Sequence, residues 1–201
     1  MDAVRVSALR ERLTGTGWLE AVGGFAGSLR RSVERRGAGE LLLVGTEAYE
    51  PWHLAAHLED EAAWSAVPRL TPTLLRHRPP AAAPAHLTHG LRRLAEAGRG
   101  ATVLVVAPGA AGTPLLERVQ DARRQGATVL ALEGAGPAIP GDLAGLAHER
   151  LAVGTAAEEP FDLAQHLVSA AAGQPVGRRS ALGRLAELAG RLTSTPPLSR
   201  W

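Results

Sequence analysis

The chain has 201 residues but no cysteine and no lysine, and aromatic side chains make up only 3% of it. The absence of cysteine excludes disulfides, thiolate catalysis and cysteine-ligated zinc sites. Apolar runs stay below the roughly 20 residues that a membrane-spanning helix needs, and the first residues lack the apolar core of a secretory signal peptide. These absences predict a cytoplasmic protein that has no contact with a membrane.

The isoelectric point is high, ≈ 10.2, although the net charge is only +2. Without lysine or cysteine, and with one tyrosine, almost nothing titrates between histidine and arginine. The arginines occur as scattered pairs, which is typical of solvated helix faces. Because nucleic-acid binding needs clustered positive charge, the high isoelectric point does not predict a DNA or RNA partner.

Short apolar runs alternate with amphipathic segments along the chain, and glycine or proline separates many of them. The apolar runs predict five strands, at 41–44, 70–77, 102–107, 127–132 and 150–153. The amphipathic segments predict helices over 3–36 with a break near residue 14, and over 51–66, 85–97, 114–125, 142–148, 161–172 and 180–192.

Strands of nearly continuous valine and leucine that alternate with helices are typical of a parallel sheet covered on both faces. Right-handed crossovers then predict a doubly wound α/β fold of flavodoxin-like order with five strands and with helices at both ends of the chain. We divide the chain into an N-terminal helical segment (1–39), an α/β domain (40–173) and a C-terminal helix and tail (174–201). Ligands of such folds bind beyond the carboxyl ends of the strands. Three loops are expected there, at 45–50, 108–113 and 133–140.

The most informative stretch is 101–134, a strand, a glycine-containing loop, a helix and a second strand. Its order resembles the sugar isomerase (SIS) domain, with phosphoheptose isomerases as the nearest branch. The resemblance covers roughly residues 20–173. It rests on Leu104–Val106, Pro108–Thr113, the pair Ala122–Arg123, Gly126 and Val129–Leu132. It implies a sugar or sugar-phosphate ligand, isomerase chemistry, and self-association as a homodimer or homotetramer.

The loop at 108–113 departs from the family pattern, in which hydroxyls and backbone N–H groups hold a phosphate. Pro108 and Ala110 occupy hydroxyl positions, and in the first loop Glu47 would repel a phosphate. The loop is therefore either a ligand cradle or a tight turn of small residues. As a ligand site it would use Gly45, Thr46, Gly109, Gly112, Thr113 and Glu133.

Two histidines, His53 and His57, lie four residues apart and therefore share one helix face, which Glu61 continues. The resemblance implies that His53 keeps a family histidine, that His57 replaces the catalytic glutamate, and that His166 matches a histidine of the late helix. It thus implies a catalytic and metal-binding group of three histidines, with Glu61 or Glu158 as a further ligand, which suits zinc. The alternative is that His53 and His57 are ordinary helix residues, one packed and one solvated.

Two functions from different classes follow. The first is an SIS-like protein that binds a sugar phosphate and moves a proton between adjacent carbons. The second is a catalytically silent SIS-like scaffold, regulator or assembly subunit, whose apolar helix stripes contact a partner or pack on the protein's own sheet. Those stripes are Val22, Phe25 and Leu29 near the N-terminus and Leu182, Leu185, Leu188 and Leu192 near the C-terminus.

Overall fold

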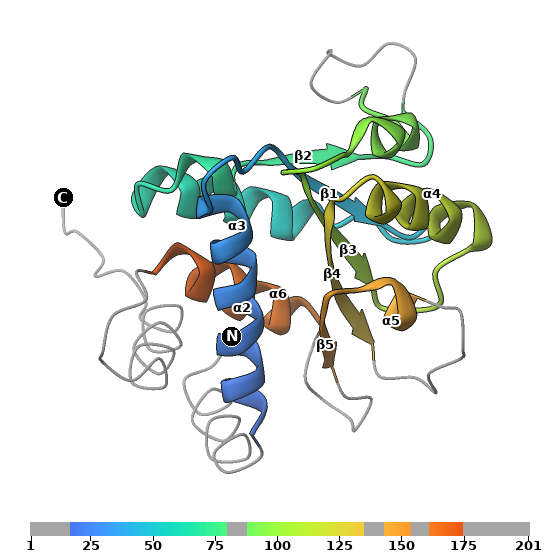
Figure 1. Ribbon diagram of the computed structural model, residues 1–201. Coiled ribbons are helices and arrows are strands. Elements are labelled where there is room, and N and C mark those ends of the chain that lie inside the picture. The colour runs from blue at the N-terminus through green and yellow to red at the C-terminus, as the bar shows by residue number, and fades with distance from the viewer. Residues whose placement is uncertain (1–16, 80–87, 135–142, 154–160, 175–201) are drawn as a thin grey trace, which may run out of the picture.

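The computed structural model describes residues 17–79, 88–134, 143–153 and 161–174 (Figure 1). Within them, five strands form one parallel sheet in the order β2-β1-β3-β4-β5. This order confirms the doubly wound, flavodoxin-like α/β fold. The strands are β1 Leu41–Gly45, β2 Pro72–Leu75, β3 Thr102–Ala107, β4 Thr128–Gly134 and β5 Glu149–Val153.

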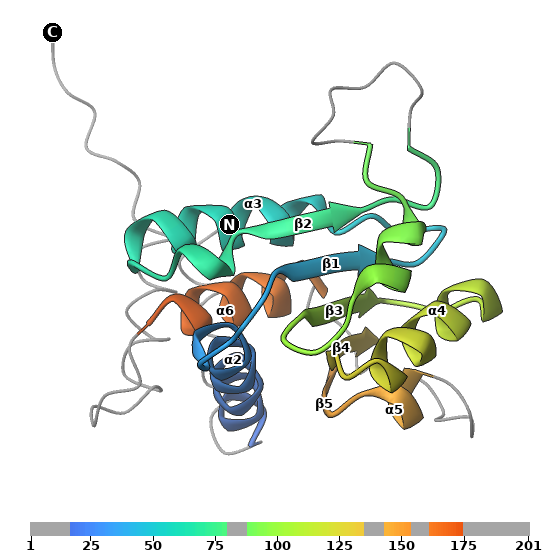
Figure 2. The same cartoon turned by 45° about the horizontal axis from the view of Figure 1, so that its top comes forward.

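Helices cover both faces of the sheet. Figure 1 shows α2 and α6 on one side of the strands and α4 and α5 on the other, and Figure 2 shows α6 between α2 and α3. The helices are α2 Trp18–Glu34, α3 Trp52–Trp64, α4 Thr113–Arg124, α5 Leu143–Leu146 and α6 Phe161–Gly173, with 3-10 turns η1 Pro68–Leu70 and η3 Leu91–Glu96.

Alternating residues of each strand point into two separate cores, because successive side chains of a strand face opposite sides of the sheet. Leu41 and Leu43 of β1 pack with α2, α3 and α6, whereas Leu42 and Val44 pack with η3 and α4. All five residues of β1 are buried. This two-sided burial is the reason that the strands are continuous in valine and leucine.

The strands β1 and β3 are neighbours, and successive strands are added to the sheet in opposite directions on the two sides of this pair. The crossover through α3 leads from β1 to the edge strand β2, and the crossover through α4 leads from β3 toward β4. Gly45 pairs with Val106, so the two central strands end at nearly the same level. The loops that follow them flank the crevice in which ligands of doubly wound sheets bind. Pro72, whose missing N–H would weaken a central strand, is the first residue of the edge strand β2.

The helix expected over 85–97 is wrong in the part that the structure describes. A 3-10 turn covers only Leu91–Glu96, and Gly90, in extended conformation, forms a parallel bridge with Arg76. The backbone N–H of Arg76 donates to the carbonyl of His89 at 2.9 Å. Pairing with the end of the edge strand therefore outweighs the helix propensity of this alanine- and leucine-rich segment.

Two further boundaries differ from expectation. β4 extends to Gly134, so Glu133 lies inside the strand and not in the loop after it. The helix expected over 142–148 is one turn, Leu143–Leu146, since the N–H of His148 already donates to Val129 at 2.8 Å and β5 begins at the next residue. The helices expected over 3–13 and 180–192 lie outside the described residues.

The apolar stripe of α2 does not face a partner. Val22, Phe25 and Leu29 are at most 1% exposed and belong to the core between α2, α6 and the sheet. The proposal that this stripe binds another protein is therefore wrong, and α2 packs in the same core as the sheet. In the described part of the chain, no helix has the length and apolar character needed to cross a bilayer.

Gly45 allows the chain to turn tightly out of β1. A Cβ at this position would overlap the carbonyl oxygen of Tyr49, and Thr46 and Tyr49 form an antiparallel bridge across the turn. We expect Gly45→Ala to lower the free energy of unfolding by about 1–3 kcal/mol, as for other overpacked sites, in urea titrations. Gly24→Ala, at an exposed helix position with no neighbour within 4 Å, should stabilise by about 0.5–1 kcal/mol. Equal effects of the two substitutions would contradict this account of the turn.

Candidate functional site

Polar contacts fasten the loop after β1 to the end of β2. The Arg76 guanidinium pairs with Glu50 at 3.0 Å and lies 5.0 Å from the centre of the Trp52 ring. The indole N–H of Trp52 donates to the same carboxylate at 2.7 Å. Pro51 is buried directly before the first turn of α3, where its fixed φ suits the start of a helix. These contacts hold the N-terminal end of α3 at the carboxyl edge of the sheet.

The three predicted histidines come together between α3 and α6. The ring centres of His57 and His166 are 3.9 Å apart, and His53 lies 6.0 Å from each of them. His53 and His57 share a face of α3, as their spacing predicts, and the packing of α6 beside α3 adds the third ring. The cluster is half-buried, since His53 is exposed and the other two are partly covered.

The cluster favours neutral imidazoles. Burial is the main cause that lowers the pKa of His57, followed by the charge of His53, while Asp60 opposes the shift. Burial also lowers the pKa of His166, followed by His57 and His53, and Asp162 opposes it. A neutral ring keeps a free lone pair on one nitrogen, which can accept a proton or bind a metal ion.

Glu61 continues the histidine face of α3 and packs against α6. A Cβ on Gly173 would overlap the Glu61 carboxyl group, so the glycine makes room for it. Burial and the neighbouring Asp60 raise the pKa of Glu61. The carboxyl group therefore lies between the helices in a setting that disfavours its charge.

A polar group that the sequence patterns did not predict lies at the start of α6. The fully buried Gln165 donates through Nε2 to the Tyr49 hydroxyl at 2.7 Å and to Asp162 at 3.0 Å. Burial is the main cause that raises the pKa of Tyr49, so its hydroxyl stays protonated. Among the described residues the Gln165 Oε1 atom has no hydrogen-bond partner. The available sequence signal was Gln165 directly before His166, with Asp162 three residues earlier in the same helix.

In the described part of the chain, no hydrogen bond or ion pair links the other predicted ligand residues to the three histidines. Gly109, Gly112 and Thr113 are exposed, and Gly112 is the residue before the first turn of α4. The Glu133 carboxylate pairs with Arg150 of β5 at 2.6 Å, and its side chain is 13% exposed. Glu158 lies outside the described residues.

The histidine rings meet without converging on a metal position. In the described segments, no three histidine, aspartate or glutamate side chains are arranged to hold a metal ion. With Zn–N bonds of about 2.0–2.1 Å, rings around a tetrahedral zinc have centres roughly 5 Å apart. The 6.0 Å separations from His53 approach that span, whereas the 3.9 Å pair is too close. The donor types suit zinc, but zinc binding requires His57 and His166 to move apart from their 3.9 Å separation.

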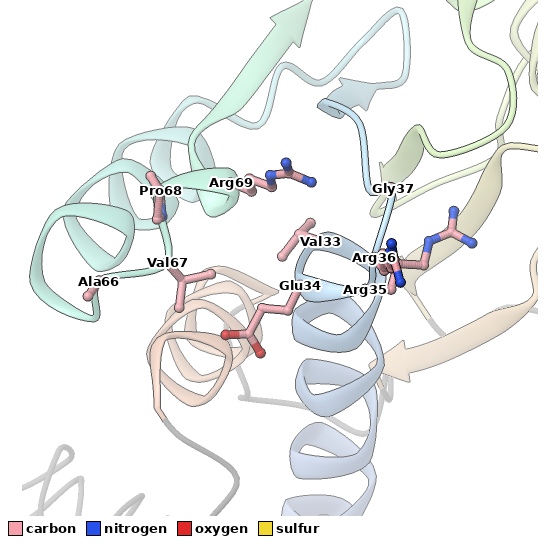
Figure 3. Close-up of a pocket in the computed structure, with 9 residues that line it drawn as sticks. All are labelled: Val33, Glu34, Arg35, Arg36, Gly37, Ala66, Val67, Pro68 and Arg69. Carbon is pink, nitrogen blue, oxygen red and sulfur yellow. The ribbon is translucent and has the colours of Figure 1, made fainter.

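One hollow of about 400 Å³ lies far from this chemistry, between the end of α2 and the turn before β2 (Figure 3). It is at the amino edge of the sheet, opposite to where ligands of this fold bind. The Glu34 carboxylate there is held by Arg30 at 2.8 Å, and Arg69 donates to the Ala38 carbonyl. Arg35 and Arg36 also line this hollow, and it is the position at the amino edge, not the charge, that separates the hollow from the ligand region of the fold.

A second hollow of about 680 Å³ lies at the carboxyl edge. It is lined by residues that follow β2, by η3 and by the start of α4. His77, which lies in its wall, donates from Nε2 to the Gly45 carbonyl at 3.0 Å, because a carbonyl oxygen can only accept. The hollow therefore adjoins the turn that ends β1.

Solved structures match this arrangement over nearly the whole of this chain. The sugar isomerase domain of an RpiR transcription factor from Sphaerobacter thermophilus superposes with a TM-score of 0.51 at 14% identity, covering 94% of this chain and 96% of that one. The chain has the fold of the sugar isomerase domain. A protein of Salmonella typhimurium LT2 named for sugar binding matches with a TM-score of 0.53 at 20% identity. One from Silicibacter pomeroyi DSS-3 named for phosphosugar isomerisation matches at 0.53 and 18%.

This chain spans 54% of the length of each of the last two proteins and 95% and 94% of its own. No protein-family model matches the sequence, and a comparison with curated proteins finds no match either. The similarity establishes the SIS fold, and the relation to the phosphoheptose isomerase branch stays a prediction.

The lowered pKa values of His57 and His166 make stability depend on pH. An unfolded histidine titrates near pH 6.5, so below this pH the unfolded chain binds more protons than the folded, metal-free protein. The free energy of unfolding should therefore fall as the pH drops from about 7.5 to about 5.5. We expect a smaller fall in a His57→Gln/His166→Gln variant, in urea titrations at both pH values with a chelator present. An equal fall in both proteins would show that the pair does not carry the effect.

Proposed function

We propose that this SIS-fold protein binds a phosphorylated sugar at the carboxyl edge of its sheet and that the histidine cluster supplies proton-transfer chemistry there. The observation that carries the proposal is the approach of His57 and His166 to a ring separation of 3.9 Å, with both pKa values lowered. The names of the SIS-fold proteins with which it superposes, for sugar binding and phosphosugar isomerisation, support the ligand class.

The chemistry that fits is aldose–ketose isomerisation. A neutral imidazole accepts the proton from the hydroxyl-bearing carbon beside the carbonyl of the ring-opened sugar, and the imidazolium returns it to the former carbonyl carbon. The hydroxyl proton of the first carbon passes to the former carbonyl oxygen, so that the alcohol becomes the ketone and the aldehyde becomes an alcohol. His57 and His166 are the candidates for this base, since burial keeps each neutral near pH 7. The half-buried Tyr49, whose hydroxyl accepts from the buried Gln165, is a candidate to hold a sugar hydroxyl close to the start of α6.

Alternatively, His53, His57 and His166 would be the ligands of a zinc ion, with Glu61 on the same helix face as a further candidate. A ring nitrogen that binds zinc has no lone pair left for a proton, so His57 and His166 serve either as ligands or as the base. A zinc ion bound there would polarise the sugar carbonyl. The chain's own contribution is to hold three imidazole donors on two packed helices and to keep the cluster half-covered from water.

The second candidate is a catalytically silent ligand sensor or assembly protein. The exposed loop at 108–113 favours it, because Pro108 and Ala110 occupy hydroxyl positions of the family and only Thr113 keeps a hydroxyl. The exposed Trp64, 78% accessible at the end of α3, supports contact with another chain. Self-association as a homodimer or homotetramer belongs to both candidates, and light scattering after size exclusion measures it.

Exchange of substrate hydrogen with solvent separates the two candidates. In D₂O the protein should place deuterium on the carbon next to the carbonyl of its sugar phosphate, detected by proton NMR over a panel of pentose, hexose and heptose phosphates. His57→Gln and His166→Gln should slow this exchange by about 10²–10⁴-fold, the usual worth of a general base. Binding without exchange would establish the silent candidate.

Zinc binding is tested on the purified full chain. We expect close to one equivalent of zinc by mass spectrometry after dialysis, and its loss in His57→Ala and in His166→Ala. Glu59→Ala removes an exposed carboxylate on the opposite side of α3 and should keep the metal. Retention of zinc in both histidine variants would overturn the assignment of these ligands.

A further inference from the structure

The geometry points to an anion subsite in which Arg92 and Arg118 hold the phosphate of the ligand, in the hollow between η3 and α4. This inference rests on the proposed function for the sugar part of the ligand, but the subsite itself requires only a phosphate group. Its residues lie apart from the loop hydroxyl positions on which the SIS resemblance places a phosphate.

The position of the hollow is the first argument. Pro114, in its wall, is the second residue of α4 and directly follows the loop at 108–113. His77, on the other side, contacts the Gly45 carbonyl at 3.0 Å. The hollow therefore joins the loops that follow β1 and β3, which is the region where a doubly wound sheet binds its ligand.

The balance of charge is the second argument. The wall holds three arginines, Arg92, Arg93 and Arg118, and one carboxylate, Glu96. Arg93 pairs with Glu40 at 2.9 Å and with Glu96 at 3.4 Å, so its single charge is shared between two carboxylates. Among the described residues, Arg92 and the half-buried Arg118 have no hydrogen-bond or ion-pair partner. Two guanidinium groups without a counterion in one hollow match a phosphate, which they can bind with paired N–H donors.

The N-terminal end of α4 is the third argument. The residue before the helix is Gly112, which offers no side chain to cap the N–H groups of the first turn. The positive end of the helix dipole is therefore uncompensated, next to the hollow that Pro114 lines. Anions are favoured at such a helix start, and here the two arginines strengthen the same preference.

The size of the hollow indicates more than a bare ion. About 680 Å³ lies in the range of small-molecule sites, roughly 300–1,000 Å³. A phosphate fills a small part of that volume, so a sugar-sized body can occupy the rest. The arginines thus supply the anion contacts that Pro108 and Ala110 cannot make in the neighbouring loop.

The test compares Arg92→Ala, Arg118→Ala and the double variant with the wild-type full chain. The probes are inorganic phosphate, glucose 6-phosphate, ribose 5-phosphate and uncharged glucose, in calorimetry and ³¹P NMR at one fixed ionic strength. We expect each single variant to weaken phosphate and sugar-phosphate binding roughly tenfold to a hundredfold, the usual effect of a charge-assisted hydrogen bond, and the double variant to abolish it.

The control is Arg124→Ala, which removes the same charge from the exposed end of the same helix, where Arg124 pairs with Asp121 at 3.5 Å. It should leave every affinity within about twofold, since exposed pairs contribute little. Circular dichroism verifies that each variant is folded. Arg118→Lys keeps the charge without the fork and should retain part of the affinity.

The outcomes separate this inference from the proposed function. Unchanged phosphate affinity in the double variant overturns the subsite, while histidine-dependent deuterium exchange would still support the proposed function. Loss of phosphate binding in the double variant, without any exchange in the wild type, supports the subsite and overturns the isomerase. A wild-type protein that binds neither phosphate nor either sugar phosphate overturns the subsite and the sugar-phosphate ligand together.

Discussion

The packing of α6 beside α3 on one face of the sheet is the contact on which the candidate site depends. It brings His166 to within 3.9 Å of His57, between ring centres, and places Glu61 against Gly173. The contact exists because both helices bury their apolar faces in one core with alternate leucines of the strands. The hydrophobic effect thus positions ionisable groups that would otherwise repel one another, and burial keeps the histidines neutral.

The residues proposed for proton transfer and those proposed for phosphate binding lie on opposite faces of the sheet. On the α3 and α6 face lie groups that can exchange protons, and on the α4 face lie Arg92 and Arg118, which carry fixed charge. The switch point between β1 and β3 lies between the faces, since both strands contribute alternate residues to the two cores. A ligand that spans the switch point could place a phosphate on one side and a carbonyl on the other. The loop at 108–113 would then supply shape, with its small residues allowing close approach.

The fold was largely predictable, whereas the site was predictable only in part. Continuous valine and leucine runs indicated buried parallel strands, and the i, i+4 spacing placed His53 and His57 on one helix face. The helix predicted over 85–97 is wrong in its described part because Gly90 pairs with Arg76 at the sheet edge. Local helix propensity cannot indicate such a contact between distant segments. Glu133 was expected to be free for a ligand, but its partner Arg150 lies on the neighbouring strand.

By itself, the sequence determined the order of the elements, the strand-forming residues and the types of side chain available for chemistry, because these depend on local periodicity and composition. Only the tertiary structure decided which of those side chains meet. The third histidine, the Tyr49–Gln165 hydrogen bond and the wall that contains Arg92 and Arg118 each join segments far apart in the chain. Their approach follows from strand order and helix packing, which are collective properties of the whole core and are not encoded at any one position.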